Sequence, residues 1–177
     1  MSFSELGLDP LILKSVLASG YENATPVQMQ AIPAALTGRD LLVSSHTGSG
    51  KTAAFLLPSL KRLQAEPTVK SMGPRVLVLT PTRELALQVE KAAMKYGNDL
   101  RRFRTACLVG GAPYGLQLKR LSQPVDVVVA TPGRLIDHLE RGKIDFSRLE
   151  VLVLDEADRM LDMGFVDDIK AIAARCP

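Results

Sequence analysis

The stretch "DLLVSSHTGSGKTAAF", residues 40–55, decides what kind of fold this chain adopts. It starts with a short apolar run, passes through a glycine-rich turn and ends in a segment typical of a helix. A buried strand, glycines and a helix N-terminus together form a phosphate-binding loop, because glycine lets backbone N–H groups turn inward around an anion. The usual pattern has glycine where Ser45 stands, but Gly48 and Gly50 can supply the turn. The alternative is an ordinary glycine turn before a helix.

Short apolar runs rich in β-branched residues recur along the chain. Each is continuously apolar, as expected of strands that are buried on both faces. The predicted strands cover residues 41–44, 75–80, 105–109, 125–130 and 150–155. Predicted helices follow them at residues 52–63, 82–96, 114–121, 133–142 and 167–175, and two more precede them at 10–19 and 26–36. This alternation predicts an α/β fold, a mostly parallel sheet with helices on both faces.

Three features of the predicted helices can be compared with the structure. Thr25 before Pro26 is a good cap followed by proline at the first helical position. Pro58 predicts a kink in the helix after the glycine-rich turn. The helix at residues 82–96 can form one apolar stripe, made of Leu85, Leu87, Val89, Ala92 and Ala93.

The composition is that of a globular protein, with 46% hydrophobic and 23% charged residues. A formal net charge of +3 is too small to show nucleic-acid binding by itself. The chain has two cysteines, Cys107 and Cys176, without a CxxC pair, and two histidines. We therefore expect no zinc site and no structural disulfide, but two reduced thiols in a cytoplasmic protein, with Cys107 in the core. Neither a secretory signal nor an apolar run of membrane-spanning length is expected.

The residues that follow the strands are the best candidates for a site, because ligands of parallel α/β sheets bind at the carboxyl ends of the strands. Asp155 and Glu156 follow the last apolar run. In a nucleotide site Lys51 would reach the outer phosphates. Thr52 and Asp155 would hold Mg²⁺, Asp155 usually through water, and Glu156 would orient and deprotonate the attacking water. An acidic helix N-terminus is the alternative for the pair, but its combination with the glycine-rich loop favours a nucleotide site.

Six motifs then occur in order along the chain. They are "GYENATPVQMQAIP" (20–33), "SSHTGSGKT" (44–52), "PTRELA" (81–86), "GG" (110–111), "TPGR" (131–134) and "DEAD" (155–158). Over nearly its whole length the chain therefore resembles the first RecA-like domain of DEAD-box ATP-dependent RNA helicases of the bacterial type. The resemblance implies a RecA-like P-loop NTPase domain with ATP and Mg²⁺ as cofactors and RNA as a partner.

The resemblance also implies residue roles in nucleotide binding. Gln28 would read the adenine edge, which predicts ATP over GTP, since a primary amide both donates and accepts hydrogen bonds. Phe3, seventeen residues before Gly20, would shape the base pocket with Tyr21 and Thr25. The implied nucleotide-binding residues are Phe3, Tyr21, Thr25, Gln28, Ser45, His46, Thr47, Gly48, Ser49, Gly50, Lys51 and Thr52. The implied catalytic residues are Lys51, Asp155 and Glu156.

RNA is expected along the other strand ends. Thr-Pro pairs at 80–81 and 131–132 would open helices whose first N–H groups can bind phosphate oxygens, although each pair alone is an ordinary helix start. The resemblance implies an RNA path formed by Pro81, Thr82, Arg83, Gly110, Gly111, Thr131, Pro132, Gly133 and Arg134. The absence of Trp and the 5% aromatic content favour binding to the sugar-phosphate backbone over base stacking. Binding should therefore be salt-sensitive and tolerant of sequence.

The predicted organisation is an N-terminal helical part with the glutamine motif, residues 1–38, and a RecA-like ATP-binding part, residues 39–177, which together form one domain. The family's Ser-Ala-Thr strand, which lies between the strands at 41–44 and 150–155, and its second RecA-like domain would follow Pro177. We therefore expect little activity from this chain alone. Expected partners are that second domain of the same full-length chain and RNA-processing or ribosome-assembly proteins. The open alternatives are a nucleotide- or protein-binding module without turnover, a different P-loop enzyme such as a small-molecule kinase, and DNA in place of RNA.

Overall fold

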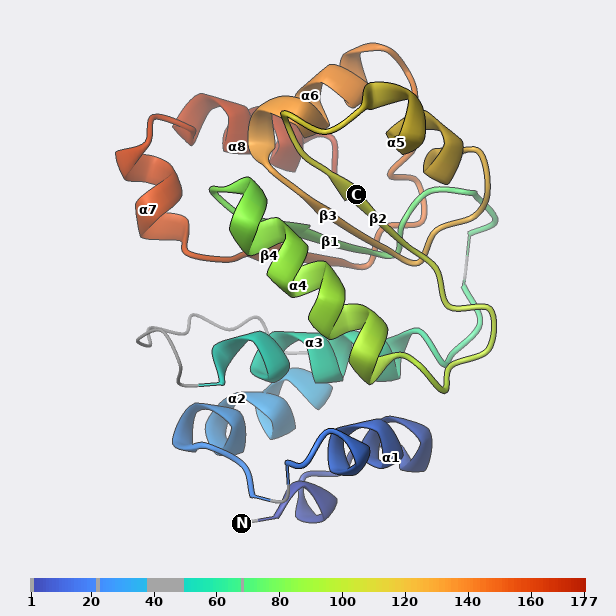
Figure 1. The fold of residues 1–177 in the computed structure, drawn as a ribbon, viewed down its shortest axis with the longest axis vertical. Coiled ribbons are helices and arrows are strands. Elements are labelled where there is room, and N and C mark those ends of the chain that lie inside the picture. Colours follow the sequence, from blue (N-terminus) through green and yellow to red (C-terminus); the bar gives the residue numbers. More distant parts are fainter. Residues whose placement is uncertain (1, 22, 38–49, 68) are drawn as a thin grey trace. The chain divides into compact units, whose positions relative to one another are not determined.

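The computed structural model describes residues 2–21, 23–37, 50–67 and 69–177 (Figure 1). They form two compact units. Unit 1 contains Met1–Glu66 and Ala92–Phe103, and unit 2 contains Pro67–Lys91 and Arg104–Pro177. The predicted strand at 41–44 and Ser45, His46, Thr47, Gly48 and Ser49 of the phosphate loop lie outside the described residues. The predicted boundary at residue 38 therefore stays a prediction.

Unit 1 is helical in its described part. It contains the short 3₁₀ helix η1 (Phe3–Glu5), α1 (Pro10–Ala18), α2 (Pro26–Leu36), α3 (Lys51–Arg62) and the last turns of α4 (Arg83–Tyr96). Both α1 and α2 pack against α3. The fully buried side chains of this unit are mostly branched aliphatic residues, among them Ile12, Ile32, Leu56, Leu57 and Leu60. Each fully buried side chain of this size contributes roughly 1.5–3 kcal/mol of hydrophobic stabilisation.

Unit 2 contains a parallel sheet of four described strands. These are β1 (Val76–Leu79), β2 (Thr105–Leu108), β3 (Val127–Ala130) and β4 (Val151–Leu154), in the order β2-β3-β1-β4. All three neighbouring pairs are parallel, with Val76 opposite both Val127 and Val151. Every residue of β1 and β3 is buried, whereas β4 is half-buried and forms one edge of the described sheet. This confirms the predicted parallel sheet. All four strands therefore end on the same side of the sheet, called the carboxyl edge below.

Helices cover both faces of this sheet. The unit contains α5 (Tyr114–Leu121), α6 (Pro132–Glu140), α7 (Ala157–Asp162) and α8 (Val166–Ala174). One core joins alternate strand residues to α6, α7 and α8, and it includes Leu77, Leu79, Leu108, Leu135, Met160 and Ile172. On the opposite face the Thr105 hydroxyl donates to Glu90 of α4 at 3.0 Å. Since Thr105 and the core residue Ala106 point to opposite faces, α4 covers the second face, and the predicted α/β class is confirmed.

The helix predictions hold at most positions and fail at particular ones. Thr25 caps α2 as predicted, and the predicted helices match the observed ones to within about two residues. Leu87, however, is 45% exposed, so its place in the apolar stripe of α4 was wrong. The buried positions of α4 are Ala86, Val89, Ala93 and Tyr96, which follow the 3.6-residue helical period. Pro58 is buried inside α3, and the kink expected there stays a prediction.

Two sequence expectations concern the chain as a whole. Within the described ranges, the helices are too short or too polar for any of them to cross a bilayer. Cys107 and Cys176 are both free thiols, and both are half-buried, so Cys107 lies at the margin of the core instead of inside it.

Candidate functional site

Gln28 links the start of α2 to the start of α3 within unit 1. Its side-chain oxygen accepts from the Thr25 N–H at 2.9 Å, and the Thr25 hydroxyl accepts from the Gln28 N–H at 3.4 Å. This reciprocal arrangement is a capping box, which satisfies two N–H groups of the helix start. The Gln28 side-chain nitrogen donates to the Gly50 carbonyl at 3.1 Å. Gln28 is therefore a buried connector and not the exposed helix glutamine that its position alone would suggest.

The described end of the phosphate loop is built as a helix start. Gly50 has a φ of 85°, in the left-handed region that favours glycine, and it caps α3, whose first residues are Lys51 and Thr52. The N–H groups at the start of a helix of this length attract anions, because they have no partner within the helix. Lys51 and Thr52 are half-buried. This geometry suits phosphate binding by Gly50, Lys51 and Thr52.

The two aromatic residues predicted for the base pocket lie in different environments. Phe3 is only 2% exposed and belongs to the apolar core of unit 1. Tyr21 is 47% exposed, and the Lys95 ammonium lies 5.1 Å from its ring centroid. The structure therefore gives Phe3 a packing role and leaves the ring of Tyr21 accessible for stacking. The part of either residue in a base pocket stays a prediction.

The "DEAD" residues follow β4 at the carboxyl edge of the sheet. Asp155 is 5% exposed, and its N–H donates to the Leu79 carbonyl of β1 at 2.9 Å. Glu156 adopts φ 54° and ψ 51°, a left-handed conformation that costs roughly 1–2 kcal/mol for a residue with a side chain. Its carboxylate pairs with Arg159 at 3.7 Å. Such backbone strain is typical of functional positions.

The donor chemistry of the predicted magnesium ligands can be compared with what the ion prefers. Mg²⁺ binds hard oxygen atoms and keeps several waters, so one carboxylate and one hydroxyl beside phosphate oxygens are a fitting set. Asp155 and Thr52 supply these two oxygen types. Thr52 belongs to unit 1 and Asp155 to unit 2, so their joint coordination of one ion stays a prediction. In the described part of the chain, no group of three or more His, Cys, Asp or Glu side chains is placed to hold a metal.

The predicted RNA residues all lie in unit 2 and follow β1, β2 and β3 at the same edge. α6 begins as predicted, with Thr131 at the cap position and Pro132 at the first helical position. The Thr131 hydroxyl makes no capping bond, and a Cβ on Gly133 would meet nothing within 4 Å. The start of this helix is therefore open to a phosphate group.

The start of α4 differs from the prediction. Pro81 does not occupy the first helical position, because α4 begins at Arg83. The Thr82 hydroxyl accepts from the Leu85 N–H at 3.2 Å and so caps the helix itself. Because the Thr82 side chain satisfies an N–H group of the first turn, Thr82 is the residue that caps α4, and the expected Thr-Pro start was wrong here.

The turn after β2 connects the predicted RNA residues to one another. Three of its backbone carbonyl oxygens accept side-chain hydrogen bonds. Gln117 donates to Val109 at 2.9 Å, Arg83 to Gly111 at 3.2 Å and Arg134 to Ala112 at 3.3 Å. Gly111 has a φ of 78°, which requires glycine, whereas Gly110 is exposed with open space where a Cβ would lie. Arg83 and Arg134 thus hold the turn as well as being candidates for phosphate contact.

Sequence reasoning missed two buried polar residues of this network. Gln117 is 4% exposed and His138 is fully buried, and their side chains meet at 2.7 Å. The signal that could have revealed His138 is its spacing in α6, three residues after Leu135 on the buried face of the helix. No comparable signal marks Gln117.

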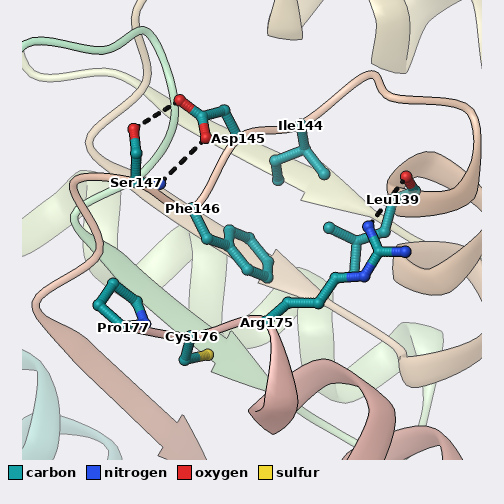
Figure 2. Close-up of a pocket in the computed structure, with 8 residues that line it drawn as sticks. All are labelled: Leu139, Ile144, Asp145, Phe146, Ser147, Arg175, Cys176 and Pro177. Atoms are coloured by element: carbon teal, nitrogen blue, oxygen red, sulfur yellow. Dashed lines mark hydrogen bonds between the residues drawn. The ribbon is translucent and has the colours of Figure 1, made fainter.

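A pocket of unit 2 lies away from these residues. This pocket of about 420 Å³ is bordered by the loop before β4 and by the ends of α6 and α8 (Figure 2). Its lining consists of Leu139, Ile144, Asp145, Phe146, Ser147, Arg175, Cys176 and Pro177. Arg175 bridges it to the Leu139 carbonyl at 3.3 Å. It lies on the side where β4 begins, away from the carboxyl edge, and contains no predicted site residue.

Comparison with known proteins agrees with the motifs at the strand ends. Residues 25–177 match the model of the DEAD/DEAH box helicase family. The chain belongs to the DEAD/DEAH box helicase family. The matched range contains every predicted site residue except Phe3 and Tyr21.

Similar helicases come from plants, bacteria and yeasts. The chain is 48% identical over 177 residues to "DEAD-box ATP-dependent RNA helicase 14" of Arabidopsis thaliana, covering all of this chain and 28% of that protein. It is 49% identical over 176 residues to "ATP-dependent RNA helicase DeaD" of Escherichia coli K12, covering 99% of this chain and 27% of that protein. It is also 49% identical over 172 residues to "ATP-dependent RNA helicase DBP2" of Vanderwaltozyma polyspora, covering 97% of this chain and 39% of that protein. The chain thus spans between about a quarter and two fifths of the length of these relatives.

Proposed function

We propose that this chain is the ATP-binding domain of an ATP-dependent RNA helicase. In the full-length protein it would couple ATP binding and hydrolysis to local unwinding of an RNA duplex. The observation that carries the proposal is the gathering of the motif residues of unit 2 at the carboxyl ends of β1, β2, β3 and β4. Family membership and the names of the relatives support it.

Unit 1 would supply the nucleotide-binding residues. Gln28 would recognise adenine after its side-chain amide gives up a bond to the Gly50 carbonyl or the Thr25 N–H. Lys51 would neutralise the outer phosphates, and the Thr52 hydroxyl would hold Mg²⁺. Because the Gln28 amide bonds to both the α2 start and Gly50, adenine recognition would be linked to the shape of the phosphate loop.

Unit 2 would supply the residues that act on the reaction and on RNA. Bound Mg²⁺ neutralises charge on the phosphates, and Asp155 would hold it, usually through water. Glu156 would orient the attacking water and accept its proton. Arg83, Arg134 and the N–H groups at the start of α6 would contact phosphates of the RNA backbone. Such contacts carry no base code, so binding should tolerate many sequences.

The partners beyond RNA and the location in the cell belong to the same proposal. We propose that a second RecA-like domain of the full-length chain closes over the same nucleotide, and that RNA-processing or ribosome-assembly proteins select the RNA. We also propose a cytoplasmic location. Two free cysteines in 177 residues support it, because they are too few for a disulfide framework.

A competition titration tests the nucleotide part of the proposal. A fluorescent adenine nucleotide is displaced from the protein with ATP, ADP, AMP or GTP, and the titration is repeated with Gln28→Ala and Lys51→Ala. We expect the adenine nucleotides to compete, GTP to compete poorly, and both variants to lose affinity by about tenfold or more. Equal competition by GTP would refute the assigned role of Gln28, and an absence of binding would refute the nucleotide site.

A further inference from the structure

The orientation of the Gln117 side chain is fixed by its own hydrogen bonds. Its nitrogen donates to the Val109 carbonyl at 2.9 Å, in the turn after β2. Its oxygen therefore faces two other partners, Arg134 at 3.3 Å and His138 at 2.7 Å. An amide oxygen only accepts hydrogen bonds, so His138 donates from Nε2, and in the neutral ring Nδ1 then carries no proton. One buried amide thus joins β2, α5 and α6.

The His138 ring is held on its face as well as at its edge. It stacks on Tyr114, with ring centroids 4.4 Å apart and planes 6° from parallel. The guanidinium groups of Arg134 and Arg141 lie 5.5 and 4.8 Å from the centroid of the same tyrosine ring. Aromatic stacking and cation–π contact both stabilise this arrangement of rings and guanidinium groups. The ring system therefore restricts the positions that Arg134 can take.

The Arg134 guanidinium is positioned by one of its nitrogen atoms. Nη1 donates both to the Ala112 carbonyl and to the Gln117 oxygen, each at 3.3 Å. Arginine has five N–H donors in a planar fork, so two bonds from Nη1 fix the plane without using the whole fork. A planar donor held in place loses less entropy when it binds a phosphate.

We propose that Gln117 and His138 are positioning residues that hold the Gly110–Gly111 turn and Arg134 in one fixed arrangement for binding RNA phosphates. The inference rests on the proposed function, since it assumes that this edge binds RNA. Neither residue needs to touch RNA. Gln117 acts through Arg134, which is itself bonded to the turn at Ala112, and His138 acts by fixing the Gln117 oxygen.

The test measures RNA affinity in the full-length protein by fluorescence anisotropy, with a labelled single-stranded oligouridine. Gln117→Met removes the amide at similar volume, Arg134→Ala removes the phosphate donor, and a third variant combines both. We expect Gln117→Met to weaken RNA binding about five- to tenfold and to add less than about twofold once Arg134 is absent, because residues that act as a unit are not additive. Gln88→Met, the same change at an exposed position of α4, is the matched control and should bind RNA as the parent does.

Two readings would overturn the inference. One is unchanged RNA affinity in Gln117→Met alongside a loss in Arg134→Ala, which leaves the proposed function intact. The other is a double variant whose losses multiply, because Gln117 would then act independently of Arg134. If the parent protein itself binds no RNA, both the proposed function and this inference fail.

A second variant keeps the test valid if Gln117→Met does not fold, as judged by thermal melting. His138→Phe retains a ring that can stack on Tyr114 but removes the donor to the Gln117 oxygen. We expect a two- to fivefold loss of RNA affinity with nucleotide affinity unchanged, and again little further loss when it is combined with Arg134→Ala. An RNA affinity equal to that of the parent would overturn the role of His138.

Discussion

At the scale of single residues, Gln28 and Gly50 show how one contact can serve both folding and ligand recognition. The Gln28 amide is buried and bonded to the Gly50 carbonyl at 3.1 Å. A Cβ on Gly50 would run into this amide and would lie 2.9 Å from the Thr25 hydroxyl oxygen. Glycine at this position is therefore required by its φ of 85° and by the close approach of the glutamine motif.

Gly50→Ala tests this contact, with Gly7→Ala as its control. Both glycines have positive φ, but the nearest atom to a Cβ on Gly7 is 3.7 Å away, an ordinary contact. Gly7→Ala should cost about 1–2 kcal/mol of backbone strain in the free energy of unfolding. Gly50→Ala should cost roughly 1–3 kcal/mol more, because it also displaces the buried amide. Urea unfolding measures both, and equal losses in the two variants would show that the Gln28 contact is unimportant.

Cys107 provides a second prediction at this scale. Burial, with a further contribution from Glu90, raises the pKa of the Cys107 thiol to about 12. Because the thiolate is the reactive form, alkylation by iodoacetamide at pH 8 should be roughly 10³-fold slower than for an ordinary cysteine. Unfolding in urea should restore the ordinary rate. Fast labelling of Cys107 in the folded protein, located by peptide mass spectrometry, would contradict the structure.

At the scale of elements, α6 combines a stability role and a binding role in nine residues. Its first turn is open at the carboxyl edge of the sheet, and its buried face carries Leu135, His138 and Leu139. These roles make opposing demands on Gly133, which weakens the helix but leaves space at its start.

Gly133→Ala should therefore separate stability from RNA binding. The change should raise the free energy of unfolding by up to about 1 kcal/mol, because alanine favours the helix and open space surrounds the new methyl group. It should lower RNA affinity, because the methyl group would stand where a phosphate approaches the N–H groups. Thermal melting and RNA anisotropy on the same samples measure the two effects. A stabilised variant with unchanged RNA affinity would argue against a phosphate at this helix start.

His138 predicts a dependence of stability on pH. Burial lowers the pKa of His138 from its ordinary 6.5, and Arg134 and Arg141 lower it further, with Asp137 opposing them. As the pH falls below 6.5, the unfolded chain binds the proton first, so the folded state loses stability until the pH reaches the lowered pKa. Thermal melting between pH 5 and 8 should thus show a steeper loss at low pH for the parent than for His138→Phe. Parallel curves would mean that His138 does not carry this dependence.

The elements differ in how far the sequence could predict them. The four described strands were predictable because short, continuously apolar runs such as "VLVL" at 76–79 are typical of strands in a parallel sheet. The same four letters at 151–154 form β4, which is only half-buried, so the run predicts the strand but not its burial. The helix α7 was missed, since six residues are too few to show a helical period. The capping role of Thr82 was missed because the neighbouring Pro81 suggested another helix start. Which residue caps the helix depends on the backbone geometry that brings the Thr82 hydroxyl to the Leu85 N–H.

The candidate site was predictable in its motifs but not in its connections. The resemblance named Arg83, Arg134 and the two glycines, and the structure places all four around one turn. It could not reveal that Gln117 and His138 link them, because a buried glutamine and an exposed one look alike in sequence. Burial of the Gln28 amide was unpredictable for the same reason.

At the scale of the whole molecule, the motifs are divided between the two units. Unit 1 carries Gln28, Lys51 and Thr52, and unit 2 carries Asp155, Glu156 and the candidate RNA residues. In the proposed reaction, residues of both units act on the same ATP. RNA contacts in unit 2 should then change the rate of a reaction whose nucleotide is bound through unit 1.

The steady-state rate of ATP hydrolysis by the full-length protein, with oligouridine RNA titrated in at fixed Mg²⁺, tests this coupling. We predict that RNA raises the rate at least about tenfold, that GTP does not replace ATP, and that Glu156→Gln abolishes hydrolysis while the fluorescent nucleotide still binds. A hydrolysis rate that RNA does not change would refute the coupling, and a rate that survives Glu156→Gln would refute the proposed role of Glu156.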